Sequence, residues 1–248
     1  MTLVQKIPGA FAITDPNWPV YSQPDTTTGL VTVLEAQALV ASIANGAKIT
    51  SWPASGGSGG VGAGQVAAEN NPTLIHSALN GRAVARFDPS SAQRMRSPGA
   101  STPTLATPMT YAAVVRCTDV SSTRPVIGTR TPDYLRLDIG VGGVARLALN
   151  SATAGPAVQM ADPTGVAILV GRASESGAKI FVAQSGVPIV SGESEGRAIV
   201  AGGISLASNT PGIVTFAGDI AECRSWSRAL TDVDIAQLIA DWRTKYGI

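Results

Sequence analysis

The chain has 248 residues, of which 14% are charged, and its 18 basic residues nearly balance its 17 acidic ones. Soluble proteins average about 25% charged residues, so Ser, Thr, Gly and Ala must make up much of this surface. The composition excludes a charge-rich disordered chain and a coiled coil, and the scattered basic residues predict no nucleic-acid partner. The length fits one large all-β domain or two small ones.

Residues 1–28 are predicted to form an extended arm, because four prolines recur there every few residues. The arm contains Phe11, Trp18 and Tyr21, and a solvated tail has little use for aromatic side chains. We therefore expect it to pack on its own domain or on a neighbouring subunit. It lacks the apolar stretch of a signal peptide, and no segment is long enough to span a membrane. We expect synthesis in a cytoplasm and no membrane partner.

The next elements are a strand at residues 30–34 and a short helical stretch that ends near Asn45 and Gly46. A glycine-rich loop follows at residues 55–64. It lacks the lysine and hydroxyl residue of a phosphate-binding loop, so we expect no nucleotide there.

From residue 82 onward the chain consists of short strand-like runs separated by Gly, Pro, Ser, Asn and Asp. Several alternate with period two, which is typical of strands with one buried face. Evenly spaced strands without helices between them predict an antiparallel sandwich or barrel, and residues 29–248 are expected to be one domain. Cys117 and Cys223 lie in such runs, and the sequence favours two buried thiols over a bridge without deciding between them.

The last segment is predicted to be a helix. Thr231 is its expected N-cap, with Asp234 three residues later in a capping-box pattern. Leu230 and Ile235 occupy the positions of a hydrophobic staple. An apolar stripe with i, i+3, i+4, i+7 spacing, which ends at Trp242, should lie against the sandwich. Gly247 follows the last turn and is the expected end of the helix.

Two stretches carry a resemblance to a known family. The first runs from Ile49-Thr50-Ser51-Trp52-Pro53 through Asn71-Pro72-Thr73-Leu74-Ile75 to Ala78-Leu79-Asn80-Gly81-Arg82-Ala83-Val84-Ala85-Arg86-Phe87-Asp88. The second joins Phe216-Ala217-Gly218-Asp219-Ile220-Ala221-Glu222 to Ser227-Arg228-Ala229-Leu230-Thr231-Asp232 and Lys245-Tyr246-Gly247-Ile248. Together they resemble the concanavalin A-like, laminin-G-like jelly-roll domains of bacterial surface proteins and bacteriophage structural proteins. The resemblance implies an all-β sandwich of two antiparallel sheets with a C-terminal helix. Trp52 lacks the acidic residue that commonly follows it in the family.

The sequence contains few candidate catalytic residues. Glucanases of this fold use an E-x-D-x-x-E strand, whereas Glu193 and Glu195 are a lone pair flanked by Gly and Ser, which predicts an exposed turn. His76 is the only histidine and is expected on a polar surface link. No cluster of metal ligands is apparent, and a single structural calcium is not favoured. We therefore predict no catalytic residues, no cofactor and no enzymatic activity.

Carbohydrate binding, which the fold also implies, usually relies on exposed aromatic side chains. The candidates are Trp18, Trp52, Tyr134 and Trp226. Trp52 is expected in the core and Trp226 against the helix, which leaves Tyr134 as the predicted glycan contact.

Three functional hypotheses follow. The first is a bacteriophage virion structural protein (a capsid decoration, head-fibre or tail-associated subunit) at the virion surface. It would assemble through Phe11, Trp18 and Tyr21 with the major capsid protein or other virion proteins, form a homo-oligomer and contact host-surface glycans. The alternative is a carbohydrate-binding module or adhesin of a bacterial surface protein. The third is a glycoside hydrolase that uses Glu193 or Glu195.

Overall fold

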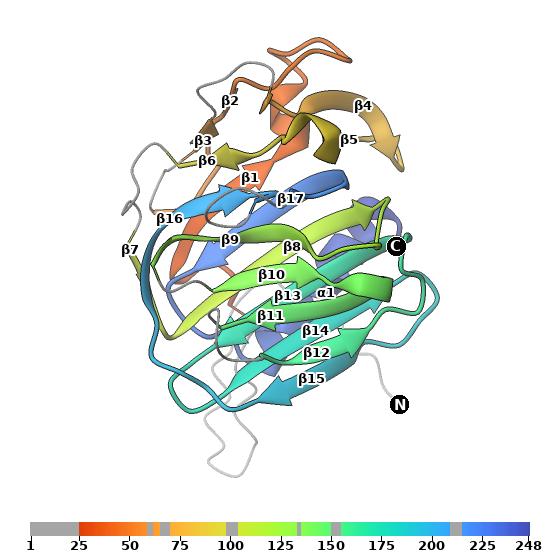
Figure 1. Ribbon diagram of the computed structural model, residues 1–248. Helices are drawn as coiled ribbons and strands as arrows, with labels where there is room; N and C mark the ends of the chain where they lie inside the picture. Colours follow the sequence, from red (N-terminus) through yellow and green to blue (C-terminus); the bar gives the residue numbers. More distant parts are fainter. Residues whose placement is uncertain are drawn as a thin grey trace, which may run out of the picture.

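A computed structural model describes residues 25–58, 62–64, 70–97, 104–132, 135–149, 155–208 and 215–248. In this part of the chain two antiparallel sheets pack face to face, and one helix lies on the side of the first sheet that faces away from the second (Figure 1). The predicted all-β sandwich with a C-terminal helix is thus confirmed.

The sheet that carries the helix is called sheet A. Its strand order is β15-β14-β13-β8-β17-β5-β4, with β1 also paired to β17. The strands are β1 (Leu30–Glu35), β4 (Thr73–Leu79), β5 (Arg82–Phe87), β8 (Met109–Cys117), β13 (Val166–Ala173), β14 (Ala178–Gln184), β15 (Val190–Ser194) and β17 (Gly218–Trp226).

The opposing sheet is called sheet B. Its order is β12-β11-β10-β9-β16-β6-β3-β2, with β7 also paired to β16. The strands are β2 (Ser51–Trp52), β3 (Ala63–Gly64), β6 (Met95–Arg96), β7 (Thr104–Ala106), β9 (Arg124–Pro132), β10 (Arg136–Ile139), β11 (Val144–Ala148), β12 (Ala157–Gln159) and β16 (Val200–Leu206). Short 3-10 turns occupy Ala36–Leu39, Pro89–Ser91 and Val141–Gly143.

The main core lies between the two sheets. Sheet A is apolar on both faces, because its inner face packs on sheet B and its outer face packs on the helix. In β8, for example, Tyr111 and Ala113 face the main core while Ala112 and Val114 face the helix. Strands buried on both faces read as continuous apolar runs, which explains the composition of β8 and β13.

The helix α1 (Asp232–Tyr246) has the predicted ends. Thr231 and Asp234 form a reciprocal capping box, and Gly247 ends the helix in the left-handed conformation at φ 64°. Its apolar stripe, which includes Leu238 and Trp242, is buried against the outer face of sheet A. Burial of this stripe fixes the helix on the sheet, with its N-terminus above the β13–β15 side.

Several local predictions change. The helical stretch after residue 35 is only the 3-10 turn Ala36–Leu39. The polar link that contains His76 is strand β4, where the ring Nε2 lies 3.1 Å from the carbonyl oxygen of Ile43. The predicted turn at Glu193 is edge strand β15, because pairing with β14 supplies backbone hydrogen bonds that local residue preferences do not reveal. Cys117 and Cys223 are buried free thiols, and burial raises the pKa of each.

Candidate functional site

A row of polar side chains crosses the outer face of sheet A near the N-terminus of α1. Cross-strand pairing joins Trp226 to Thr110, Thr110 to Arg172, Arg172 to Lys179 and Lys179 to Glu193. Directly paired residues share one face of a sheet, so these five side chains all point to the side on which the helix lies. The strand register therefore brings together charges that are far apart in the sequence.

The outer end of this row is a cluster of opposite charges. The Arg172 guanidinium lies 2.6 Å from the Asp232 carboxylate, and the Lys179 ammonium lies 2.6 Å from Glu193 and 3.3 Å from Asp232. The hydrogen bond with Glu193 raises the pKa of Lys179. Both cations also lie over the Phe181 ring, with the Lys179 nitrogen 4.9 Å from its centroid. Lys179 is thus held between two carboxylates and an aromatic face.

The two cations are less exposed than the two carboxylates. The side chains of Lys179 and Arg172 are 17% and 25% exposed, whereas those of Asp232 and Glu193 are 59% and 68% exposed. The cations therefore form the floor of the cluster and the carboxylates its rim. A molecule that approaches from solvent would meet acceptors first and donors beneath them.

The cluster borders a hollow of about 430 Å³, which is called the charged hollow. Its size falls in the range of small-ligand sites, roughly 300–1,000 Å³. Hydroxyl groups join the charged groups around it. The lining residues are Arg172, Ser174, Ser176, Gly177, Ala178, Lys179, Glu193, Ser194 and Ala229.

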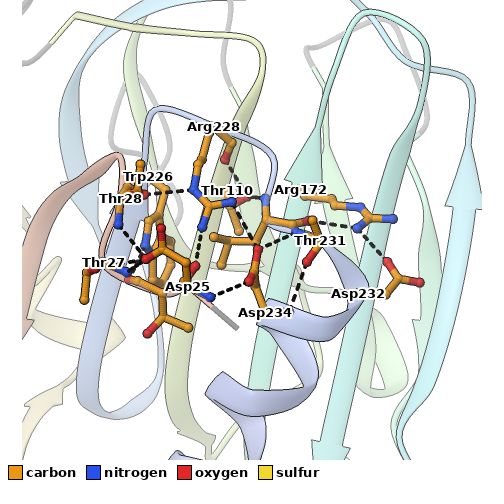
Figure 2. Close-up of polar contacts among 12 residues, drawn as sticks. Asp25, Thr27, Thr28, Thr110, Arg172, Trp226, Arg228, Thr231, Asp232 and Asp234 are labelled. Atoms are coloured by element: carbon orange, nitrogen blue, oxygen red, sulfur yellow. Dashed lines mark hydrogen bonds and ion pairs between the residues drawn. The ribbon is translucent and has the colours of Figure 1, made fainter. Parts of the chain in front are cut away.

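Hydrogen bonds fix the wall of the charged hollow on the helix side (Figure 2). Arg172 donates to the Leu230 carbonyl at 2.8 Å. The Thr110 hydroxyl donates to the Arg228 carbonyl at 2.8 Å and accepts from the Leu230 amide at 3.0 Å. The turn that leads into the helix is therefore attached to two strands of sheet A, and Asp232 is positioned by that attachment.

Beside this wall Arg228 attaches the start of the described chain to the helix (Figure 2). Its guanidinium donates to the Thr28 carbonyl at 2.8 Å, pairs with the Asp234 carboxylate at 3.1 Å and bonds the Asp25 carbonyl. The Asp25 amide also donates to Asp234 at 2.7 Å, and the Trp226 indole donates to the Thr26 carbonyl. We call these contacts the Arg228 anchor.

The electrostatics of the Arg228 anchor favour ionised carboxylates. Hydrogen bonds from Thr28 and Thr27 hold the pKa of Asp25 well below its usual range. Burial opposes ionisation of Asp234, but hydrogen bonds from the Asp25 and Thr231 amides outweigh it and lower its pKa. The N-terminus of the helix adds a favourable field for Asp234. The anchor is therefore expected to remain charged and intact at neutral pH.

A second hollow of about 450 Å³ lies near the other end of the helix, where Leu79, Asn80, Asp162, Val166 and Gln184 contribute to its lining. Its amide side chains serve the fold: Asn80 donates to the Gly247 carbonyl at 3.1 Å, and Gln184 exchanges two hydrogen bonds with the Asp162 backbone. The charged hollow offers more side-chain groups to a polar ligand.

The structure tests some of the site residues predicted from the sequence and not others. Phe11, Trp18, Tyr21 and Tyr134 lie outside the described residues, so the assembly arm and the glycan contact stay predictions. Trp52 and Trp226 are buried as expected. Among the described residues, no three His, Cys, Asp or Glu side chains gather as metal ligands, and no helix is long and apolar enough to cross a membrane.

Glu193 lies at the charged hollow, but its carboxylate partner there is Asp232 and not Glu195, which is exposed past the end of β15. Sequence reasoning missed Arg172, Lys179 and Asp232. The alternation of β13 and β14 indicates the outward direction of both cations, but only the strand register places them beside Glu193.

No protein-family model matches the sequence, and no match was found among the curated proteins. Solved structures do match. A GH54 α-L-arabinofuranosidase is similar with a TM-score of 0.58 at 13% identity, over 78% of this chain and 50% of that one. The sialidase of Trypanosoma rangeli in complex with 2,3-difluorosialic acid has a TM-score of 0.50 at 17% identity, over 87% and 33%. Domain 4 of a GH43 extracellular arabinanase from Geobacillus stearothermophilus has a TM-score of 0.47 at 15% identity, over 84% and 97%.

The first two likenesses show a β-sandwich fold. The chain spans about a third of the length of the sialidase and half that of the arabinofuranosidase. The prediction that the chain is not an enzyme is contradicted, because structural neighbours with this sandwich are a sialidase and an arabinofuranosidase. A single histidine and the absence of an E-x-D-x-x-E strand are therefore no ground for excluding catalysis on this fold.

Proposed function

We propose that the chain binds a saccharide in the charged hollow. The observation that carries this proposal is the layered arrangement of the cluster, with Arg172 and Lys179 beneath Glu193 and Asp232. A sugar hydroxyl both donates and accepts hydrogen bonds, so adjacent hydroxyls are best bound where donors and acceptors alternate. Arg and Lys supply the donors, the carboxylates supply the acceptors, and serine hydroxyls supply both.

The fold supports the proposal. Two of the matching solved structures, with TM-scores of 0.50 and 0.58, are a sialidase and an arabinofuranosidase, so this sandwich occurs in proteins that act on sugars. The rigid floor supports it as well, since Lys179 and Arg172 are held by ion pairs and by the Phe181 ring before any ligand arrives. Such preorganisation lowers the entropic cost of binding.

A glycan array followed by calorimetry of the best ligand tests the proposal. Lys179→Ala should weaken binding about tenfold or more, because hydrogen bonds to charged groups contribute about 1.5–3 kcal/mol. Arg146→Gln removes a positive charge from β11 of sheet B, outside the hollow, and should leave this affinity unchanged. Absence of binding to any glycan on the array, or equal binding by Lys179→Ala, would contradict the proposal.

Hydrolysis of a glycosidic bond at the same hollow is a second candidate. It is favoured by one observation: Glu193 lines the hollow, and Asp232 at the start of α1 bonds the same Lys179 ammonium, so two carboxylates meet at one cation beside the hollow. Most glycoside hydrolases use a pair of carboxyl groups in catalysis. Loss of hydrolysis in both Glu193→Gln and Asp232→Asn, with folding retained, would support this candidate. Hydrolysis retained in both variants would dismiss it.

We further propose, as the sequence alone predicts, that the protein is a structural component of a bacteriophage virion. It would then bind the saccharide at the virion surface. The low surface charge and the aromatic residues before Asp25 support it. Deletion of residues 1–24 preserves the Arg228 anchor and should leave a folded domain that no longer joins its assembly. Unchanged incorporation of the shortened chain would count against the proposal.

A further inference from the structure

A row of basic side chains crosses sheet A at the end opposite to the charged hollow. Backbone pairing joins Lys48 to Thr73, Thr73 to Arg86, Arg86 to Asp219 and Asp219 to Arg116. All five therefore point to the same outer face of the sheet. Neighbouring strands lie about 4.8 Å apart, so the backbone positions of successive basic residues are roughly 10 Å apart, although Asp219 draws the guanidinium groups of Arg86 and Arg116 together. We call Lys48, Arg86 and Arg116 the basic row.

Asp219 fixes the two arginines. Its carboxylate lies 2.7 and 3.1 Å from two nitrogens of Arg86 and 2.5 Å from a nitrogen of Arg116. The Asp219 side chain is only 4% exposed, whereas Arg86 and Arg116 are 46% and 36% exposed. A single arginine would suffice to neutralise this carboxylate. Two arginines leave an excess positive charge that faces solvent.

The remaining residues of the basic row do not cancel this excess positive charge. Lys48 is exposed, and Asp88, which is close enough to feel its charge, bonds the amide and hydroxyl of Ser90. At its other end the row continues into the second hollow, because Arg116 is paired with Val166 and Val166 lines that hollow of about 450 Å³. The basic row thus leads along the sheet into a space large enough for a sugar ring.

We propose that the basic row binds an anionic polysaccharide, with carboxylate or sulfate groups placed on alternate sugars. Lys48 lies two strand spacings, roughly 10 Å, from the arginine pair at Asp219, which is close to the length of a disaccharide unit. Planar guanidinium groups held by a buried carboxylate are suited to bidentate contacts with such anions. This site shares no residue with the charged hollow, so it does not depend on the function proposed there.

Binding to immobilised polysaccharides tests the inference. Polygalacturonate supplies carboxylates, dextran sulfate supplies sulfates, and neutral dextran is the uncharged control. We expect binding to at least one of the two anionic polymers, with the tighter one identifying the anion, and loss of binding as salt screens the charges. Arg116→Gln and Lys48→Ala should each weaken binding about fivefold, the scale of one exposed charge contact.

Controls separate this site from a general loss of charge and from misfolding. Arg146→Gln removes one positive charge from β11 of the opposite sheet and should bind the anionic polymer like the wild type. Lys48→Ala removes an exposed side chain, so it reports on the site even if Arg116→Gln fails to fold. Unchanged affinity in folded Lys48→Ala and Arg116→Gln would overturn the inference. Equal binding to neutral dextran, or tighter binding to a short double-stranded DNA than to both polymers, would also overturn it.

Discussion

Replacement of Arg228 by alanine should release the chain segment that precedes β1. Arg228 donates to the Thr28 carbonyl at 2.8 Å, bonds the Asp25 carbonyl and pairs with Asp234 at 3.1 Å. Each hydrogen bond from a charged donor is worth about 1.5–3 kcal/mol when buried. The side chain is 24% exposed and Asp234 keeps the Asp25 and Thr231 amides as donors, so we expect a loss of about 2–3 kcal/mol in total.

Urea denaturation at neutral pH measures this loss. With an m-value near 2–3 kcal/mol/M, the midpoint should fall by about 1 M. Arg228→Lys keeps the charge but not the forked geometry, so it should show an intermediate loss. Hydrogen exchange should rise at the amides of Thr27 and Thr28. A change below about 0.5 kcal/mol together with unchanged exchange at these amides would refute the anchoring role.

Three further predictions concern the sandwich and its helix. Trp242→Ala should cost about 3–5 kcal/mol in urea denaturation, because a fully buried aromatic side chain is lost between α1 and sheet A; a cost below 1 kcal/mol would contradict this packing. Gly171→Ala should cost about 1–3 kcal/mol in thermal unfolding, since a Cβ there would meet the methyl groups of Leu147 and Leu137 at 2.6 and 2.7 Å; an unchanged melting temperature would argue against it. The lowered pKa of Asp234 stabilises the fold above its unfolded value of 3.8, and this contribution is lost as pH falls through the folded value. The gap in unfolding free energy between wild type and Asp234→Asn should therefore shrink with acidification, and a constant gap would contradict that assignment.

The helix and the long strands were predictable because their signals are local. The capping box of Thr231 and Asp234, the apolar stripe and Gly247 lie within one segment, and each is found where it was expected. The strands at residues 82–87 and 109–117 likewise combine β-branched and apolar residues between turn residues. Such patterns depend only on neighbours in sequence.

Edge strand β15 and the charged hollow were not predictable from the sequence, because they depend on contacts between residues far apart in the chain. The strand that contains Glu193 is rich in Gly and Ser, and its pairing with β14 overrides the local preference for a turn. The hollow itself depends on the register of β13, β14 and β15 and on where α1 begins. Asp232, which the sequence identifies only as an acidic residue in the first helical turn, meets Arg172 and Lys179 through tertiary packing.

For Asp234 the sequence predicted the local role, as part of the capping box, but not its contacts with distant residues. The capping box accounts for its bonds with Thr231, but its bond with the Asp25 amide joins residues 209 positions apart in the chain. Arg228, six residues before Asp234, bonds both the Asp234 carboxylate and the Asp25 carbonyl. One carboxylate thus caps the helix and holds the start of the described chain.

The location of the bound saccharide tests the central claim most directly. Amide chemical-shift mapping, with the tightest uncharged glycan from the array as titrant, separates the two hollows. Binding in the charged hollow predicts the largest shifts at Arg172, Lys179 and Glu193, with loss of those shifts in Lys179→Ala. Largest shifts at Asn80 and Gln184, or shifts that persist in Lys179→Ala, would contradict the assignment of the charged hollow as the saccharide site.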